Sequence, residues 1–130
     1  ATILLAASLV VASATAAYVR RLMMDKVTFI ITGNDQQGGG EEDLACAEFI
    51  AALIRGEIPD RRSVVERVQR SKSALRILEP GQQSVPPSDL VLCLGIDRFN
   101  FAMRAHRRDG RVVIGRFERW GTGALRRWNV

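Results

Sequence analysis

Hydrophobic and polar positions form blocks that predict a strand, a helix and a second strand in the first quarter of the chain. Thr2–Ala7 is a short apolar run typical of a buried strand. Val10–Met24 is rich in alanine and ends near two arginines, which favours a helix with its cationic end at the C-terminus. Val27–Thr32 is β-branched and aromatic and predicts a strand. Because the connections are short, this order predicts a βαβ unit with a parallel pair of strands.

The sequence of the middle of the chain predicts a series of helices. Glu41–Arg55 opens with three acidic residues and is then apolar nearly all round, so we expect a helix that is buried on several sides. Arg61–Lys72 follows Asp60 as N-cap and carries one narrow valine stripe among charged residues, which predicts a surface helix. Ser88–Leu94 could form either a strand or a helix, and its capping residues favour a short helix.

The last part of the chain predicts a hairpin. Phe99–Arg107 and Arg111–Glu118 alternate in part, and Arg108-Asp109-Gly110 between them is a good turn signal. Arg119–Val130 has no clear period and yields no prediction. We therefore expect one α/β domain over residues 1–130. Its predicted architecture is a three-layer α/β/α arrangement with a mixed sheet, in which a parallel βαβ unit is followed by helices and a C-terminal antiparallel hairpin.

Composition and charge narrow the range of partners. The chain is 47% hydrophobic and 25% charged, as is usual for a globular protein. Its net charge of +5 is concentrated at one end, because residues 98–130 hold nine arginines against two acidic residues. A basic end could contact nucleic acid. The arginines are scattered along the predicted hairpin, however, and the aromatic residues near them suit a strand core, so we expect no nucleic-acid partner.

The first seventeen residues resemble a signal peptide in being apolar and rich in alanine. They lack the leading positive charge of such signals and are too short to span a bilayer. A buried strand and helix explain them better, so we expect neither secretion nor a membrane partner. Cys46 and Cys93 lie in separate apolar segments, which favours free buried thiols in a reducing cytoplasm.

Three adjacent carboxylates at the start of the second helix form the first candidate site. Glu41, Glu42 and Asp43 suit the positive end of a helix, and three adjacent acids are more than capping requires, although a solvated acidic helix start would also explain them. An oxygen-rich cluster at such a loop could also hold Mg²⁺. In the glycine triplet before them, Gly39 and Gly40 could wrap a phosphate with backbone N–H groups, although a bare glycine triplet more often indicates a mobile loop.

Further along the chain, three residues have usable chemistry. Cys46, one turn into the helix, is a candidate nucleophile or a small core residue. Asp97 and Arg98 could serve catalysis and hold a phosphate or sulfonate, or could stabilise a turn as a pair. His106 is the only histidine, and nothing near it in sequence supports a catalytic triad.

Several of these segments resemble the 2-phosphosulfolactate phosphatases. Residues 42–47, Glu-Asp-Leu-Ala-Cys-Ala, are similar to that family's Glu-Asp-Leu helix. Residues 12–15, Ala-Ser-Ala-Thr, resemble its Asn-Ala-Ser-Ala/Thr segment. Residues 89–99 resemble its Asp-x-x-x-Cys…Val-Asp-Arg-Phe-Asp segment. The likeness runs from Ile3 to Phe117 in the family's order, and the motifs are persuasive jointly because each one alone is short.

The resemblance implies a Mg²⁺-dependent phosphomonoesterase that converts 2-phosphosulfolactate to 3-sulfolactate and phosphate, a step associated with coenzyme M biosynthesis. Its substrate would be a small anionic phosphate ester. Together with the chemistry above, it assigns metal binding to Glu42 and Asp43, catalysis to Asp43, Cys46 and Asp97, and substrate binding to Gly39, Gly40 and Arg98.

The chain also departs from the family's pattern. The family's N-terminal portion, which supplies much of its acidic and hydroxyl chemistry, is absent, and Val11 stands where the family usually has Asn. We therefore expect the chain to represent only the C-terminal part of such an enzyme and to need a missing N-terminal half, or a homo-oligomer, to complete a site. The alternative is a non-catalytic α/β module for ligand binding or assembly.

Overall fold

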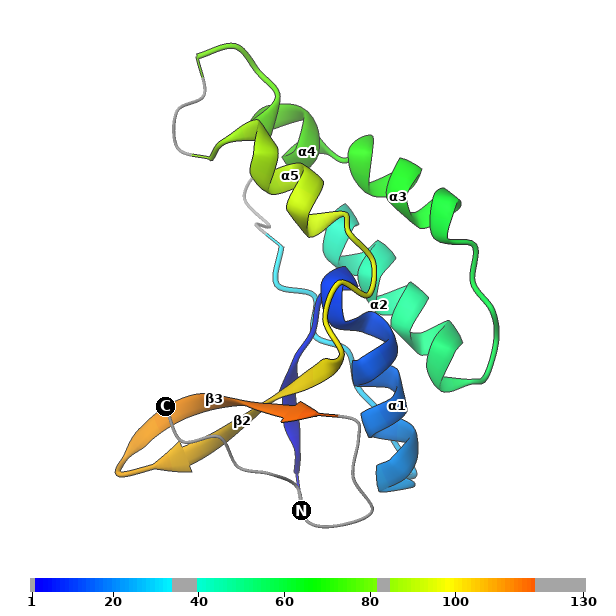
Figure 1. Ribbon diagram of the computed structural model, residues 1–130, viewed down its shortest axis with the longest axis vertical. Coiled ribbons are helices and arrows are strands. Elements are labelled where there is room, and N and C mark those ends of the chain that lie inside the picture. The colour runs from blue at the N-terminus through cyan, green and yellow to red at the C-terminus, as the bar shows by residue number, and fades with distance from the viewer. Residues whose placement is uncertain (1, 34–39, 82–84, 119–130) are drawn as a thin grey trace.

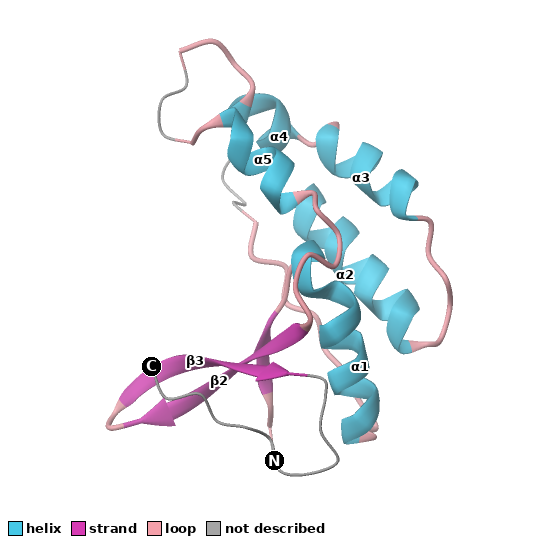
Figure 2. Ribbon diagram, in the orientation of Figure 1, coloured by secondary structure: helices cyan, strands magenta, loops and turns pink. Residues whose placement is uncertain are grey.

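The computed structural model describes residues 2–33, 40–81 and 85–118. Helices gather at one end of the molecule and a three-stranded sheet lies at the other (Figures 1 and 2). The elements in chain order are β1 (Leu4–Ala6), the 3₁₀ helix η1 (Leu9–Val11), α1 (Ala12–Leu22), α2 (Glu41–Ile54), α3 (Arg61–Gln69), α4 (Lys72–Ile77), α5 (Pro87–Cys93), β2 (Phe101–Arg108) and β3 (Arg111–Glu118). Helices and a sheet in one chain agree with the predicted α/β class.

The sheet has the order β1-β2-β3, and both pairings are antiparallel. Leu4 pairs with Ala105 in one ladder, and Arg108 pairs with Arg111 in the other. Asp109 and Gly110 join β2 to β3 with φ values of 48° and 76°. Positive φ at both central residues is the geometry of a two-residue type I′ turn, which matches the twist of the strands. The predicted C-terminal hairpin is therefore confirmed.

The structure does not show the predicted parallel βαβ unit or the three-layer arrangement. Val27–Thr32 belongs to no strand, and the described part of the chain contains no parallel pair. The partner of β1 is β2, about a hundred residues away in sequence, and no strand among the described residues pairs with the other edge of β1. The β-branched and aromatic composition of Val27–Thr32 indicated a strand, but hydrogen-bonding partners are set by tertiary packing.

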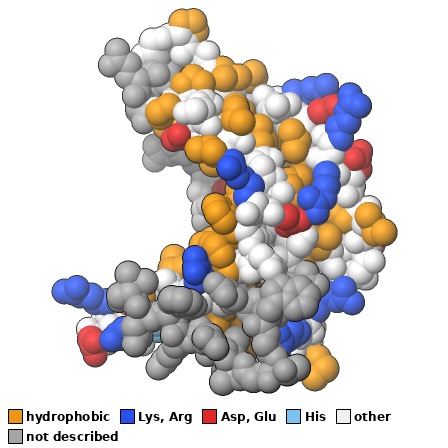
Figure 3. Space-filling view, viewed as in Figure 1, with side chains coloured by type: hydrophobic (Ala, Val, Ile, Leu, Met, Phe, Trp, Pro, Cys, Tyr) orange, Lys and Arg blue, Asp and Glu red, His pale blue; other side chains and the backbone are white. Residues whose placement is uncertain are grey.

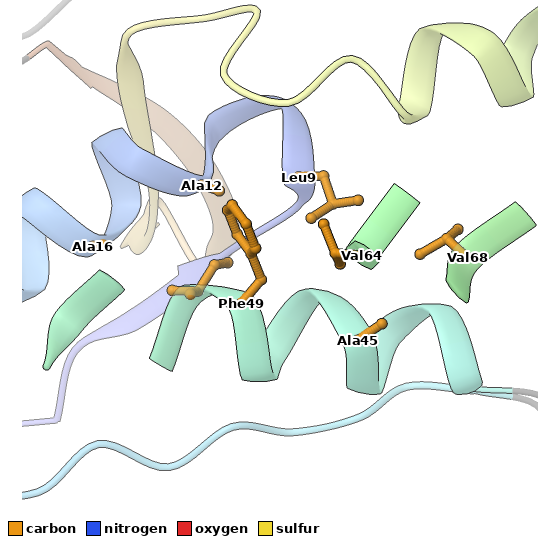
Figure 4. Packing of buried hydrophobic residues seen from close by; sticks show 8 residues of the cluster. Leu9, Ala12, Ala16, Ala45, Phe49, Val64 and Val68 are labelled. Atoms are coloured by element: carbon orange, nitrogen blue, oxygen red, sulfur yellow. The ribbon is translucent and has the colours of Figure 1, made fainter. Parts of the chain in front are cut away.

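The hydrophobic core lies where η1, α1, α2 and α3 meet (Figure 4). Small alanines on α1 and α2 let these helices approach closely, and Phe49 and Ile50 fill the space between them. Val64 and Val68 bring α3 onto the same cluster. The expected burial of α2 on several sides and the expected valine stripe of α3 are both confirmed.

Two details of the helical region differ from the sequence predictions. The helix expected over Arg61–Lys72 ends at Gln69, because Ser71 is buried and its hydroxyl accepts a hydrogen bond from the Ala74 N–H as the N-cap of α4. Helix α5 is present as predicted, but it has no buried residue and Cys93 is exposed rather than in the core. Helix α4 contacts α5, but Val91 and Leu92 of α5 remain at least half exposed.

Candidate functional site

Asp97 lies in the loop before β2 and contacts both α1 and α3. Its carboxylate accepts a hydrogen bond from the Ser13 backbone N–H and another from the Ser13 hydroxyl, both at 2.7 Å. The guanidinium of Arg61, at the start of α3, forms an ion pair with the same carboxylate. The side chain of Asp97 is 19% exposed, so it remains reachable from solvent. Ser13 and Asp97 come from two segments that resemble the phosphatase family.

The backbone around Asp97 explains how this contact is held. The Asp97 N–H donates to the Leu9 carbonyl at 3.0 Å, and the Phe99 N–H donates to the Val10 carbonyl at 3.0 Å. Asp97 has a φ of 58°, a left-handed conformation that aspartate tolerates better than most residues. A carboxylate beside the first turn of α1 also satisfies an unpaired helix N–H and the helix dipole. Asp97 therefore acts at least as a long-range cap of α1.

Arg98 lies next to this cap and is exposed. Its side-chain stem lies over Gly95, where a Cβ atom would collide with it. Its guanidinium has no hydrogen-bonding or ion-pair partner within the described ranges. A guanidinium that is held at its stem and free at its head can bind a phosphate or sulfonate with two parallel hydrogen bonds.

The three acidic residues at the start of α2 point in different directions. Glu41 is exposed, and its carboxylate accepts a long hydrogen bond of 3.3 Å from the Lys72 N–H. Asp43 accepts a hydrogen bond of 2.9 Å from the Thr32 hydroxyl. Glu42 has one carboxylate oxygen that is buried and has no partner in the described structure. Successive helical positions differ by about 100°, which explains this divergence.

The donor set at Glu42 and Asp43 fits Mg²⁺ only as a site with few protein ligands. The described residues contain no group of three or more His, Cys, Asp or Glu side chains that could hold a metal. Magnesium is often held by one or two carboxylates, with water and substrate phosphate completing its shell. The orphaned oxygen of Glu42 and the second oxygen of Asp43 are such ligands, but the two side chains diverge, so only one of them would face the ion directly. Asp97 has its partners on α1 and α3 and is not part of this pair.

Gly40 has a structural role at the start of α2. It is buried and adopts a φ of 109°, and a Cβ atom there would lie 3.3 Å from the Gly33 Cα and 3.4 Å from the Ile31 Cγ2. Glycine is therefore required for the close approach of residues 31–33 to the helix start. Gly39, the other predicted phosphate-binding glycine, lies outside the described residues.

Cys46 is partly buried and packs against the core cluster. Burial, with a smaller contribution from the nearby Asp43 carboxylate, raises the pKa of the Cys46 thiol to about 11. The thiolate is the nucleophilic form of cysteine, so this environment opposes nucleophilic catalysis at neutral pH. The structure therefore favours the core alternative for Cys46.

Sequence reasoning did not single out Ser13, Arg61 or Thr32 as individual site residues. Ser13 and Arg61 lie 84 and 36 residues from Asp97, and no local pattern connects them. Arg61 appeared only as the first residue of a surface helix. The one available signal was the resemblance of residues 12–15 to a segment of the phosphatase family. That resemblance covers Ser13 together with its neighbours and does not indicate that the Ser13 hydroxyl has a role of its own.

Comparison with known proteins gives one informative match. The chain is 28% identical over 102 residues to the probable 2-phosphosulfolactate phosphatase of Bacillus subtilis (strain 168). The match covers 78% of this chain but only 43% of the relative, so the chain spans less than half of that protein. No family model and no solved structure matches the chain. These findings support a distant relationship to a phosphatase.

None of the helices in the described ranges has the length and apolar character needed to cross a membrane.

Proposed function

We propose that this chain is part of a Mg²⁺-dependent phosphomonoesterase that hydrolyses 2-phosphosulfolactate to 3-sulfolactate and phosphate. The observation that supports this most directly is the contact between Ser13 and Asp97. It joins two segments that resemble the phosphatase family and lie 84 residues apart in sequence. The 28% identity to the Bacillus subtilis protein over 102 residues supports a distant relationship to the same family.

In this proposal, Arg98 binds an anionic group of the substrate. The substrate carries a phosphate and a sulfonate, and either could accept two hydrogen bonds from the free guanidinium. Asp97 positions Arg98 by fixing the loop to η1 and α1, and it keeps the Ser13 hydroxyl and Arg61 at the same edge.

The proposed metal ligands are Glu42 and Asp43. Bound Mg²⁺ would neutralise charge on the phosphoryl group and so stabilise the transition state. Within the chain itself, the Thr32 hydroxyl orients the Asp43 carboxylate, which leaves its other oxygen available. The backbone N–H groups of Gly39 and Gly40 would contact the phosphate.

The remaining chemistry depends on parts of an enzyme that these residues do not supply. Cys46 is disfavoured as a nucleophile by its raised pKa, so the attacking group would come from elsewhere. We propose a cytoplasmic enzyme on a route of the coenzyme M type, whose site is completed by further polypeptide. The competing function is a non-catalytic α/β module that binds an anionic ligand, which the free Arg98 guanidinium would also permit.

Phosphate release from 2-phosphosulfolactate separates these functions. We would assay the chain alone, the chain joined to the missing part of its relative, and the intact Bacillus subtilis protein, each with Mg²⁺ and with EDTA. Activity that requires Mg²⁺ and the completed polypeptide is expected. If the completed form binds the substrate but releases no phosphate, the non-catalytic module is the correct function.

Two single arginine substitutions provide the test variant and its control for this assay. Arg98→Ala should lower phosphate release at least about tenfold, because a charge-assisted hydrogen bond to the substrate is lost. Arg70→Ala removes another exposed arginine, at the end of α3, and should leave activity unchanged. Equal rates for Arg98→Ala and the unmodified protein would remove Arg98 from the site.

A further inference from the structure

The connection between α1 and α2 carries exposed apolar side chains in an uncharged run. Residues 27–32 read Val-Thr-Phe-Ile-Ile-Thr, all of them β-branched or aromatic and none of them charged or proline. Ile30 is 75% exposed, and Val27, Phe29 and Ile31 are each between 36% and 40% exposed. This composition is typical of an interior β-strand and costly to leave in water.

The backbone of this segment is also unpaired. No backbone hydrogen bond joins Val27–Thr32 to any other described residue, and its one hydrogen bond is from the Thr32 side chain to Asp43. Helices α1 and α2 run in the same direction, so the connection returns along their length without a helical turn (Figure 1). Contact between Ile31 and the Gly40 position fixes its end against α2. A row of free N–H and C=O groups is therefore held in place beside α2.

Proteins usually protect such a row when it is meant to stay exposed. Charged residues, prolines and bulges on an edge prevent pairing with another strand. Val27–Thr32 has no charged residue and no proline. Its sequence is therefore that of a strand with a partner.

A second apolar surface lies at the far end of the molecule, over α4 and α5 (Figure 3). Val91 and Leu92 on α5 are 70% and 50% exposed, and Leu75 and Leu78 near α4 are more than half exposed. Exposed apolar patches of this kind mark surfaces that other polypeptide covers. The described elements thus leave more than one apolar surface uncovered.

We propose that Val27–Thr32 is a β-strand that pairs with a strand of the complementary phosphatase polypeptide, the part of the relative that the match does not cover. The chain matches only 43% of that relative, so a polypeptide longer than the matched part remains to supply the strand. Because Val27–Thr32 is uncharged and apolar, we expect the strand that pairs with it to be uncharged and apolar as well. Within the described residues, no strand pairs with the other edge of β1 either.

This inference rests on the relationship to the relative and does not depend on phosphatase activity. The complementary polypeptide could bind and protect the segment in a protein that releases no phosphate. Loss of activity and loss of pairing are measured separately, so either proposal can fail alone.

The test uses amide hydrogen exchange and light scattering on the full chain. Alone, the chain should be a monomer whose Val27–Thr32 amides exchange rapidly. Co-expressed with the unmatched part of the Bacillus subtilis relative, it should form a one-to-one complex in which those amides exchange at least about tenfold more slowly. In the intact relative, the aligned segment should be protected to the same degree.

Two isoleucines provide the variant and its control. Ile30→Lys should abolish the complex, since it places a charge in the strand, whereas Ile58→Lys should not, because Ile58 is 99% exposed in the loop after α2. Rapid exchange of the aligned segment in the intact relative would overturn the proposal. A homodimer of the chain with protected Val27–Thr32 amides would overturn it too, since a second copy would then be the partner.

Discussion

At the scale of single residues, Asp97 is the side chain on which most long-range order near the site depends. One carboxylate caps α1, binds the Ser13 hydroxyl and pairs with Arg61 at the start of α3. The sequence identified Asp97 as a candidate through its motif, and the alternative interpretation was a turn-stabilising pair with Arg98. In the structure Asp97 pairs with Arg61 instead, because the turn directs its carboxylate towards the helices.

We predict that Asp97→Asn lowers the free energy of unfolding by about 1.5 kcal/mol, because hydrogen bonds to a charged acceptor become neutral ones. Asparagine tolerates a φ of 58°, so the backbone should not change. Urea denaturation measures the difference. Asp25→Asn, at an exposed position after α1, is the control and should have no effect. Equal stabilities for the two variants would show that Asp97 is not a cap.

We predict that Cys46 is alkylated far more slowly than Cys93 at pH 8. Burial raises the pKa of the Cys46 thiol from 9.0 to about 11, whereas Cys93 is exposed. Below pH 9 the Cys46 thiol is protonated in the folded protein, and it should become reactive only as the pH approaches 11 or the protein unfolds. Mass spectrometry after iodoacetamide treatment measures both sites. Preferential labelling of Cys46 at neutral pH would instead indicate an activated nucleophile.

At the scale of elements, the start of α2 combines a helix cap with a candidate metal site. The acidic residues stabilise the helix end, and Gly40 allows residues 31–33 to pack against it. Sequence alone could not divide the three carboxylates by role, because their hydrogen-bond partners come from other segments. Thr32 and Lys72 supply those partners for Asp43 and Glu41.

We predict that Asp43→Asn raises the Mg²⁺ concentration needed for half-maximal phosphate release in the completed enzyme. Its effect on stability should be small, about 0.3–1 kcal/mol, which is the usual contribution of a charge at a helix end. Glu41→Gln, an exposed neighbour, is the matched control and should leave the Mg²⁺ requirement unchanged. Unaltered Mg²⁺ dependence in Asp43→Asn would leave Asp43 with a capping role alone.

At the scale of the whole molecule, the packing is concentrated in the helical half. The buried cluster draws on η1, α1, α2 and α3, while the sheet and the outer helices keep many apolar side chains exposed. A chain with this distribution depends on a small core for its stability as a separate unit. It also presents apolar surface for further polypeptide.

We predict that Ile50→Ala lowers the free energy of unfolding by about 3 kcal/mol, because Ile50 is 1% exposed at the centre of that cluster. Ile58→Ala removes the same atoms at a position that is 99% exposed and should change stability by less than about 0.5 kcal/mol. Thermal and urea unfolding measure both variants. A small effect at Ile50 would mean that the helical cluster does not hold the chain together.

The sequence by itself determined the local features of this protein. The hairpin followed from Asp109 and Gly110, because only a few residues favour the left-handed turn. The burial of α2 and the valine stripe of α3 followed from helical periodicity. These signals are local, since each depends on residues within a few positions of one another.

Only the tertiary structure decided which segments meet. It paired β1 with β2 rather than with Val27–Thr32, left α5 without a fully buried residue and gave Asp97 the partners Ser13 and Arg61. Pairing and burial depend on contacts between residues far apart in the chain, and the hydrophobic pattern of one segment does not specify its partner. For Val27–Thr32 the pattern is that of a strand, yet none of the described strands pairs with it.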